Sequence, residues 1–223
     1  LSGATFDCHS PVDGRLLAQV AACDSADIDR AVAAARRSFE RGDWANATPR
    51  HRKQVLLRFA QLLRERRDEL ALTETLDVGK PISDSLTVDV LSAANCLQWY
   101  AEAIDKRYDE VAPTGPGSLA LVTREPLGVV GAIVPWNFPL QLALRSIAPA
   151  LASGCTVIAK PASWTPLSLI AWAKAMEEAD VGLPSGVLQV ITGSGGLIGD
   201  ALAGHTGVDG VVLTGGVPTG QAV

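Results

Sequence analysis

The sequence has few of the residues that build metal centres or disulfide frameworks. Its four cysteines are widely spaced among 223 residues and form no C-x-x-C pair, which argues against a zinc site and a disulfide scaffold. The three histidines show no metal-ligand spacing, so surface or capping roles are expected. Cys155 borders an apolar run without a histidine or cation nearby in the sequence, which predicts a packing role. The residues concerned are Cys8, Cys23, Cys96, Cys155, His9, His51 and His205.

The sequence also lacks an excess of positive charge and a long apolar run. A net charge of −5 gives no electrostatic reason to expect a nucleic-acid partner. The one basic cluster, at residues 50–53, leads into apolar residues at helical spacing and predicts the wet face of an amphipathic helix. With no signal peptide and no apolar run of about 18 residues, we expect a cytoplasmic protein without a membrane partner.

Residues 1–107 are predicted to form a helical N-terminal part. Ser25 is the expected cap of a helix that ends near Gly42. Thr48 and Pro49 favour the start of a long helix that stops by Gly79, and a third helix is expected over residues 82–106.

Residues 108–125 are predicted to form a hairpin that projects from the body. Two short β-prone runs, 108–112 and 119–123, flank a turn-rich cluster of proline and glycine.

From residue 126 to 223 the pattern alternates between strand and helix. Strands are expected at 129–134, 156–160, 187–191 and 211–213, with helices at 140–151, 166–179 and 197–203 between them. This alternation predicts an α/β fold with a Rossmann-like parallel sheet flanked by helices. Because ligands bind at the carboxyl ends of such strands, the segments after these strands are the functional candidates.

Two side chains at these strand ends are ambiguous when taken alone. Lys160 ends an apolar strand, where it either reaches solvent or meets an anion or a polyol. Asn137 stands between two prolines; it either satisfies local backbone groups in a turn or donates a fixed hydrogen bond to a developing oxyanion.

The glycine-rich segment 192–199 follows a strand and opens a helix. Its spacing is G-x-G-x-x-x-G and no carboxylate ends the next strand, so the ordinary dinucleotide fingerprint is absent. A cofactor contact and a plain turn both remain open for it.

Taken together, these segments resemble the N-terminal part of an NAD(P)-dependent aldehyde dehydrogenase. The resemblance covers nearly the whole chain and rests on motifs in the family's order, of which Pro135-Trp136-Asn137-Phe138-Pro139 and Lys160-Pro161-Ala162 are the most specific. Further matches are the segments 74–81, 100–102, 125–130 and 213–215. The sequences of these motifs are most similar to those of enzymes that act on succinate semialdehyde or γ-aminobutyraldehyde-type substrates.

The resemblance implies roles for individual residues. Asn137 matches the oxyanion-hole asparagine, and the hairpin matches the arm through which these enzymes form homo-oligomers. The cofactor, NAD or NADP, is expected to contact Ile133, Trp136, Lys160, Ser163, Gly195, Gly199, Thr214, Gly215 and Gly216.

Three positions depart from the family pattern. NAD-preferring members often have glutamate where this chain has Ser163, and a neutral side chain there should tolerate NADP. The family commonly has lysine at the position of Ser146 and serine at that of Gly216.

The family mechanism oxidises an aldehyde to a carboxylic acid through a cysteine thiohemiacetal and thioester, with a glutamate that activates water. Neither residue is matched within this sequence, so the fold is expected to be truncated before the catalytic domain and the chain alone to be inactive. The alternative is a non-catalytic cofactor-binding or oligomerising module, or an inactive relic.

Overall fold

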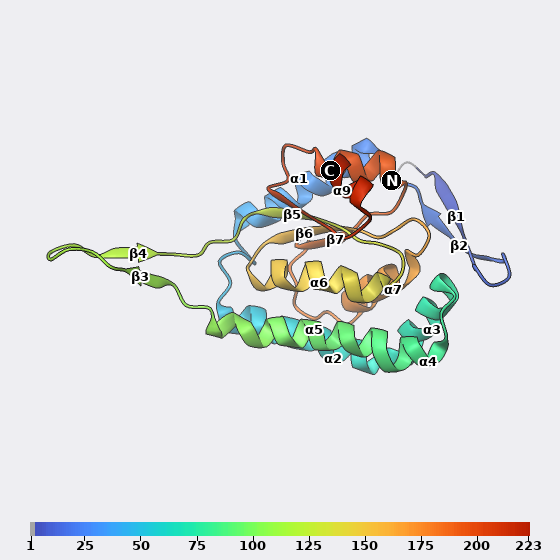
Figure 1. The fold of residues 1–223 in the computed structure, drawn as a ribbon, viewed down its shortest axis with the longest axis horizontal. Helices are drawn as coiled ribbons and strands as arrows, with labels where there is room; N and C mark the ends of the chain where they lie inside the picture. Colours follow the sequence, from blue (N-terminus) through green and yellow to red (C-terminus); the bar gives the residue numbers. More distant parts are fainter. Residues whose placement is uncertain (1–2) are drawn as a thin grey trace.

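A four-stranded parallel sheet organises the computed structural model, which describes residues 3–223 (Figure 1). Its strands are β5 (Val129–Ile133), β6 (Thr156–Lys160), β7 (Leu188–Val190) and β8 (Gly210–Leu213), in the order β7-β6-β5-β8. The chain steps outward from β5 to β6 and β7, then returns to place β8 on the other side of β5. The predicted α/β class is confirmed, and the strand order reverses between β5 and β8, the kind of point where such sheets bind ligands.

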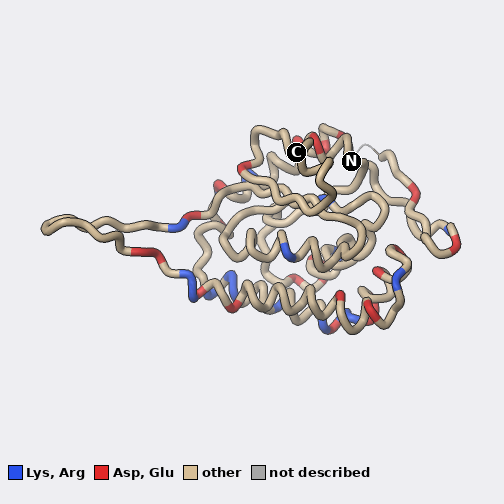
Figure 2. The backbone as a smooth tube through the Cα atoms, in the orientation of Figure 1, with Lys and Arg blue, Asp and Glu red and all other residues tan. Residues whose placement is uncertain are grey.

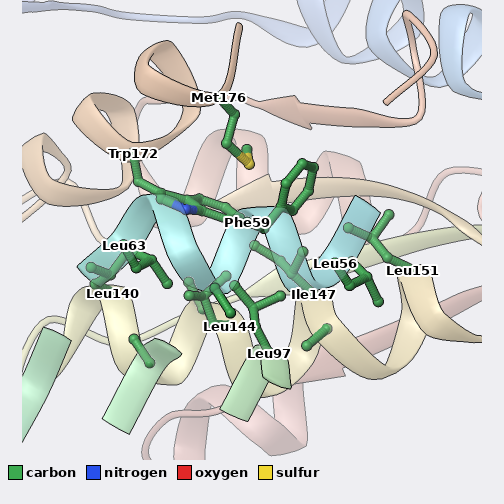
Figure 3. Packing of buried hydrophobic residues seen from close by; sticks show 14 of the residues in the cluster. Leu56, Phe59, Leu63, Leu97, Leu140, Leu144, Ile147, Leu151, Trp172 and Met176 are labelled. Carbon is green, nitrogen blue, oxygen red and sulfur yellow. The ribbon is translucent and has the colours of Figure 1, made fainter. Parts of the chain in front are cut away.

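Helices cover both faces of this sheet because alternate strand residues point to opposite sides. Val157 and Ala159 of β6 join a large core with α2 (Pro49–Glu65), α5 (Val90–Ala103), α6 (Pro139–Ala152) and α7 (Leu167–Glu178). Figure 3 shows Phe59 and Trp172 within this core. Their rings pack edge to face, with 6.1 Å between the ring centroids. Ile158 faces the other way, into a smaller core with α1 (Ser25–Arg41), the π-helical turn η3 (Gly195–Gly199) and α8 (Asp200–Ala203).

The N-terminal helices differ from the prediction in two details. The cap of α1 is Asp24, whose side chain accepts from the amide of Asp27 in a reciprocal capping box; the prediction of Ser25 was wrong because Ser25 already lies inside the helix. The expected long helix is two helices, α2 and α3 (Arg67–Val78), because Arg66 leaves helical geometry at φ −94° and ψ 17°. Thr48 caps α2 and Gly79 ends α3, as predicted.

The third predicted helix is continuous but not uniform. It runs through α4 (Ile82–Asp84), a π-helical turn η1 (Ser85–Asp89), α5 and a final 3₁₀ turn η2 (Ile104–Lys106). A π-turn inside a helix is a frequent mark of a functional site.

Two hairpins extend from the body. The predicted one, β3 (Glu110–Ala112) with β4 (Ala120–Val122), is confirmed and projects far from the sheet (Figure 1). Figure 2 shows that its outer part is free of charged residues, which gather on the body and at the hairpin's base. A second hairpin, β1 (Thr5–His9) with β2 (Leu16–Ala21), was not predicted, so the N-terminal part is not wholly helical.

The chain after β8 carries a short helix, α9 (Val217–Ala222), which the sequence pattern did not predict. None of the helices within residues 3–223 is long and apolar enough to span a membrane.

Candidate functional site

The carboxyl ends of β5, β6 and β8 lie side by side. Ile133 pairs in register with Lys160 on one side and with Leu213 on the other. The amide of Val134 donates to the Lys160 carbonyl at 3.1 Å, and the amide of Thr214 donates to the Ile133 carbonyl at 3.0 Å. Three of the predicted strand-end segments therefore meet at the edge where the strand order reverses.

Lys160 is buried at this edge without an anion. It is only 3% exposed, and its Nζ donates to the carbonyl oxygen of Pro161 at 3.1 Å. No ion pair joins it to an acidic side chain anywhere in residues 3–223, and burial lowers the pKa of the Lys160 ammonium. Of the two roles left open by the sequence, escape to solvent is excluded. A buried ammonium with so few partners favours an anion or a polyol as its ligand.

The glycines of η3 leave open space on the same face of the sheet. Ile198, between Gly195 and Gly199, packs in the smaller core with Ile158, and Ile133 packs against that core. A methyl group added at Gly195 or Gly199 would meet no atom within 4 Å beyond its chain neighbours and its own helical backbone, although Gly199 itself is buried. Protein packing therefore does not require glycine at either position, and the space fits a flat or extended ligand that approaches the backbone.

The remaining cofactor candidates flank this edge. Thr214, Gly215 and Gly216 follow β8 and are exposed. Trp136 and Ser163 line one pocket of about 340 Å³ together with residues of the N-terminal hairpin. A groove of about 800 Å³ between β2 and α7 contains none of the predicted site residues.

Asn137 lies on the exposed segment between β5 and α6. The segment is held at successive carbonyl groups: Thr165 Oγ1 donates to the Trp136 oxygen at 3.1 Å, and Lys80 Nζ donates to the Asn137 oxygen at 2.9 Å. The Phe138 oxygen then accepts from the amide of Leu142 at 2.9 Å as α6 begins. The backbone on both sides of the asparagine amide is thus fixed, as a preorganised hydrogen-bond donor requires.

Lys80 belongs to a cluster with Glu74 and Asp89 that was not predicted from the sequence. Lys80 Nζ contacts Asp89 Oδ2 at 2.6 Å and Glu74 Oε1 at 3.3 Å, and both carboxylates are buried. The signal was present, because Glu74 stands among Leu70, Ala71 and Asp77 at helical spacing, all on the buried face of α3. A carboxylate at such a position requires a partner.

Asp77 fixes the chain that follows Lys160. Its Oδ2 accepts from the amide of Leu167 at 2.8 Å, at the start of α7, and its Oδ1 accepts from the Cys8 thiol at 3.1 Å. Burial raises the pKa of Asp77 to about 6 and that of Cys8 to about 12. The carboxylate caps α7 from another helix and ties the N-terminal hairpin to it.

The cysteines and histidines occupy the modest roles expected of them. Cys155 is buried, so its predicted packing role is confirmed, and Cys8 and Cys23 are buried as well. His51 is exposed and lies edge to face with Trp44, while His9 and His205 bond backbone groups of nearby residues, Gly14 and Gly207. The basic residues at 50–53 begin α2, where Arg50 and His51 are exposed, as predicted. The prediction was wrong for Arg52, which stands three and four residues before the buried Val55 and Leu56 and donates to backbone carbonyl groups.

Comparison with known proteins gives a consistent result. Residues 2–223 match the model of the aldehyde dehydrogenase family. The chain is 51% identical to the NADP/NAD-dependent aldehyde dehydrogenase PuuC of Escherichia coli K12 over 97% of its own length and 43% of that protein. It is 49% identical to the aminoacetaldehyde dehydrogenase of Pseudomonas aeruginosa over 98% of its own length and 44% of that protein.

Solved structures agree. An indole-3-acetaldehyde dehydrogenase in complex with NAD+ superposes with a TM-score of 0.96 at 55% identity, over 99% of this chain and 44% of the other. The γ-glutamyl-γ-aminobutyraldehyde dehydrogenase of Burkholderia cenocepacia gives a TM-score of 0.96 at 53% identity, with the same two coverages. The chain thus spans less than half the length of these relatives.

Proposed function

Because the chain belongs to the aldehyde dehydrogenase family, we propose that the protein it forms part of oxidises an aldehyde to a carboxylic acid with NAD or NADP. The observation that carries this proposal is Lys160, a buried ammonium with no acidic partner among residues 3–223, at the kind of sheet edge where dinucleotides bind in such folds. The names of two relatives, an aminoacetaldehyde dehydrogenase and a γ-glutamyl-γ-aminobutyraldehyde dehydrogenase, support an amino- or γ-aminobutyraldehyde-type substrate, whereas a third is named for indole-3-acetaldehyde.

Residues of this chain would hold the cofactor. Lys160 would donate to the ribose hydroxyls, and Gly195 and Gly199 would let the adenine approach the backbone. Thr214, Gly215 and Gly216 would receive the pyrophosphate, and Ile133 and Trp136 would line the path toward the reacting end. When bound, the nicotinamide supplies the acceptor for the hydride that leaves the aldehyde carbon.

Ser163 bears on the choice between NAD and NADP. It lies just beyond Lys160 and carries no charge, so the Ser163 side chain itself would not repel a 2′-phosphate, although Asp7 and Asp77 line the same pocket. We therefore propose that the protein accepts NADP as well as NAD, with a lean toward NADP.

Asn137 would act on the aldehyde rather than on the cofactor. Its side-chain amide would donate to the carbonyl oxygen as negative charge develops there, from a backbone that is already fixed. The cysteines of this chain are poor nucleophiles because three are buried and burial raises the pKa of the fourth, Cys96. We propose that these 223 residues alone do not turn over an aldehyde.

We also propose that residues 108–125 act as an arm for homo-oligomerisation. The hairpin exposes Tyr108, Val111, Leu119 and Leu121 and has too few contacts to bury them within its own chain. Four free cysteines fit a reducing, cytoplasmic setting.

The test is aldehyde-dependent reduction of NAD and NADP by the full-length gene product. Wild-type protein should reduce the cofactor, and Asn137→Ala should lower kcat by about 100-fold or more. Asn95→Ala is the matched control, because Asn95 is exposed on α5 and bonds only Arg64. Binding of NAD(P) without turnover would support a non-catalytic module instead, and an absence of both would refute the proposal.

A further inference from the structure

Lys80 is the contact between a buried acidic pair and the segment that carries Asn137. Its Nζ donates to the carbonyl oxygen of Asn137 at 2.9 Å and lies 4.2 Å from the centre of the Phe138 ring. The same nitrogen contacts Asp89 at 2.6 Å and Glu74 at 3.3 Å. One ammonium therefore bonds the backbone of the candidate donor on one side and two carboxylates on the other.

The acidic pair fixes where this ammonium can stand. Glu74 and Asp89 are 0% and 1% exposed, and they come from α3 and from the π-helical turn before α5. One oxygen of each, Glu74 Oε2 and Asp89 Oδ1, has no hydrogen-bond partner among the described residues. The pair cannot relax toward water, so Lys80 is the group that compensates its charge.

The chain neighbours of Lys80 restrict the direction of its side chain. Gly79 ends α3 in the left-handed region at φ 82°, and Pro81 begins the next helical stretch, so the backbone around Lys80 is set from both sides. The side chain is 13% exposed, which leaves the ammonium little solvent to replace the carbonyl bond.

We propose that Lys80 is a positioning residue, which the buried Glu74 and Asp89 hold against the Asn137 carbonyl so that the Asn137 amide is fixed for its substrate. This inference rests on the proposed function, since it assigns Lys80 a role in presenting the oxyanion donor. It differs from a purely structural ion pair in one respect. Loss of Lys80 should free the segment 136–138 selectively, and not only lower global stability.

The experiment combines amide hydrogen exchange with kinetics on the full-length gene product. Lys80→Met should speed exchange at Leu142, whose amide donates to the Phe138 carbonyl, by about tenfold or more, while strand β6 stays protected. It should lower kcat by about 100-fold, the cost of a misplaced catalytic group, and leave the dissociation constant for NAD unchanged. Lys80→Arg should recover part of both losses, because a guanidinium can still donate to the carbonyl and the carboxylates.

Lys53→Met is the matched control. Lys53 pairs with Asp105 at 2.6 Å on the surface of α2, so its loss removes a lysine and an ion pair without contact with the segment. It should change neither exchange at Leu142 nor kcat.

The outcomes separate this proposal from the proposed function. Unchanged exchange at Leu142 in a folded Lys80→Met protein would overturn the positioning role, whatever the activity. If wild-type protein oxidises no aldehyde, the proposed function fails, yet the exchange comparison still decides whether Lys80 restrains the segment.

A second variant covers the case in which Lys80→Met does not fold. Asp89→Asn leaves Lys80 held by Glu74 alone and alters a residue that bonds Lys80 and not the segment, so faster exchange at Leu142 is again required. Equal exchange in that variant and in wild type would refute the proposal.

Discussion

Two lysines of this chain are largely buried, and their surroundings differ in kind. Lys80 is 13% exposed and its ammonium meets two buried carboxylates and a carbonyl oxygen. Lys160 is 3% exposed and its ammonium meets one carbonyl oxygen, that of Pro161. The positive charge of Lys80 is compensated by carboxylates of the chain, whereas that of Lys160 has no acidic partner among the described residues.

The difference indicates that Lys80 stabilises the fold and that Lys160 binds a ligand. A buried charge costs several kcal/mol unless it is paired, so a chain that buries one without a partner must gain elsewhere. At Lys80 the anions are part of the fold, and removing the cation should cost stability. At Lys160 the anion or polyol must come from outside, and removing the cation should cost binding.

The largest expected effect is on stability and falls on Lys80 alone. Lys80→Met should lower the free energy of unfolding by about 3 kcal/mol or more, because two buried carboxylates lose their compensating charge. Denaturant unfolding of the two matched variants measures it: Lys160→Met, which removes an unpaired charge, should be as stable as wild type or more so. Equal destabilisation of both variants would mean that Lys80 and Lys160 do not differ in their contribution to stability.

The next effect is the pH dependence that Glu74 imposes. Burial raises the pKa of Glu74 to about 7, against the opposing Lys80 ammonium, while the unfolded value stays near 4.5. The folded state then binds more protons than the unfolded state between these values. Stability from this group is therefore complete below pH 4.5 and is lost as the pH rises through about 7.

Glu74→Gln isolates that contribution, since the amide resembles the protonated acid. Its unfolding free energy should exceed that of wild type above pH 7 by about 3 kcal/mol and converge with it at acid pH. A smaller slope of the same sign should remain in the variant from Asp77, whose pKa burial raises to about 6. A difference between the two proteins that does not vary with pH would contradict the expectation.

The sequence could not distinguish these two lysines, although it predicted much around them. Periodicity and caps predicted the sheet, the hairpin and most helix ends, because those depend on local residues such as Thr48 and Gly79. The site edge followed from the rule that ligands bind at the carboxyl ends of parallel strands, whereas the strand order came from the structure. The burial of Lys160 and the pairing of Lys80 with Asp89 depend on tertiary contacts that no spacing encodes.

Other features were missed for the same reason. The break at Arg66 has neither glycine nor proline to mark it, and the N-terminal hairpin is held by contacts such as that of Cys8 with Asp77. Tertiary context overrides weak local preference at both places.

A third effect concerns binding at Lys160. Lys160→Met should weaken the binding of NAD by about tenfold or more, the loss of charge-assisted hydrogen bonds to the ligand. Calorimetric titration of the full-length gene product measures it. Lys174→Met is the control, because Lys174 is an exposed lysine of α7 whose ion pair with Glu178 lies on the surface. Full NAD affinity in Lys160→Met would mean that the unpaired ammonium is not a cofactor contact.

The smallest expected effect concerns Gly199, a backbone position that we propose contacts the same ligand. Gly199 has helical geometry at φ −66° and ψ −49°, and an added methyl group meets no atom within 4 Å beyond its chain neighbours and its own helical backbone. Gly199→Ala should therefore raise the free energy of unfolding by about 0.5–1 kcal/mol, the usual gain from alanine in a helix. Gly131→Ala, the matched change on β5, should instead lower it, because the new methyl group would lie 3.2 Å from Leu202 Cγ.

If the open space at Gly199 belongs to the cofactor, the stabilised Gly199→Ala protein should bind NAD more weakly than wild type. A gain in stability together with unchanged affinity would leave that glycine a feature of the turn alone. The combination of a more stable fold and a weaker complex is the same signature expected of Lys160→Met. Both positions would then be places where the chain gives up stability of the free protein in favour of a ligand.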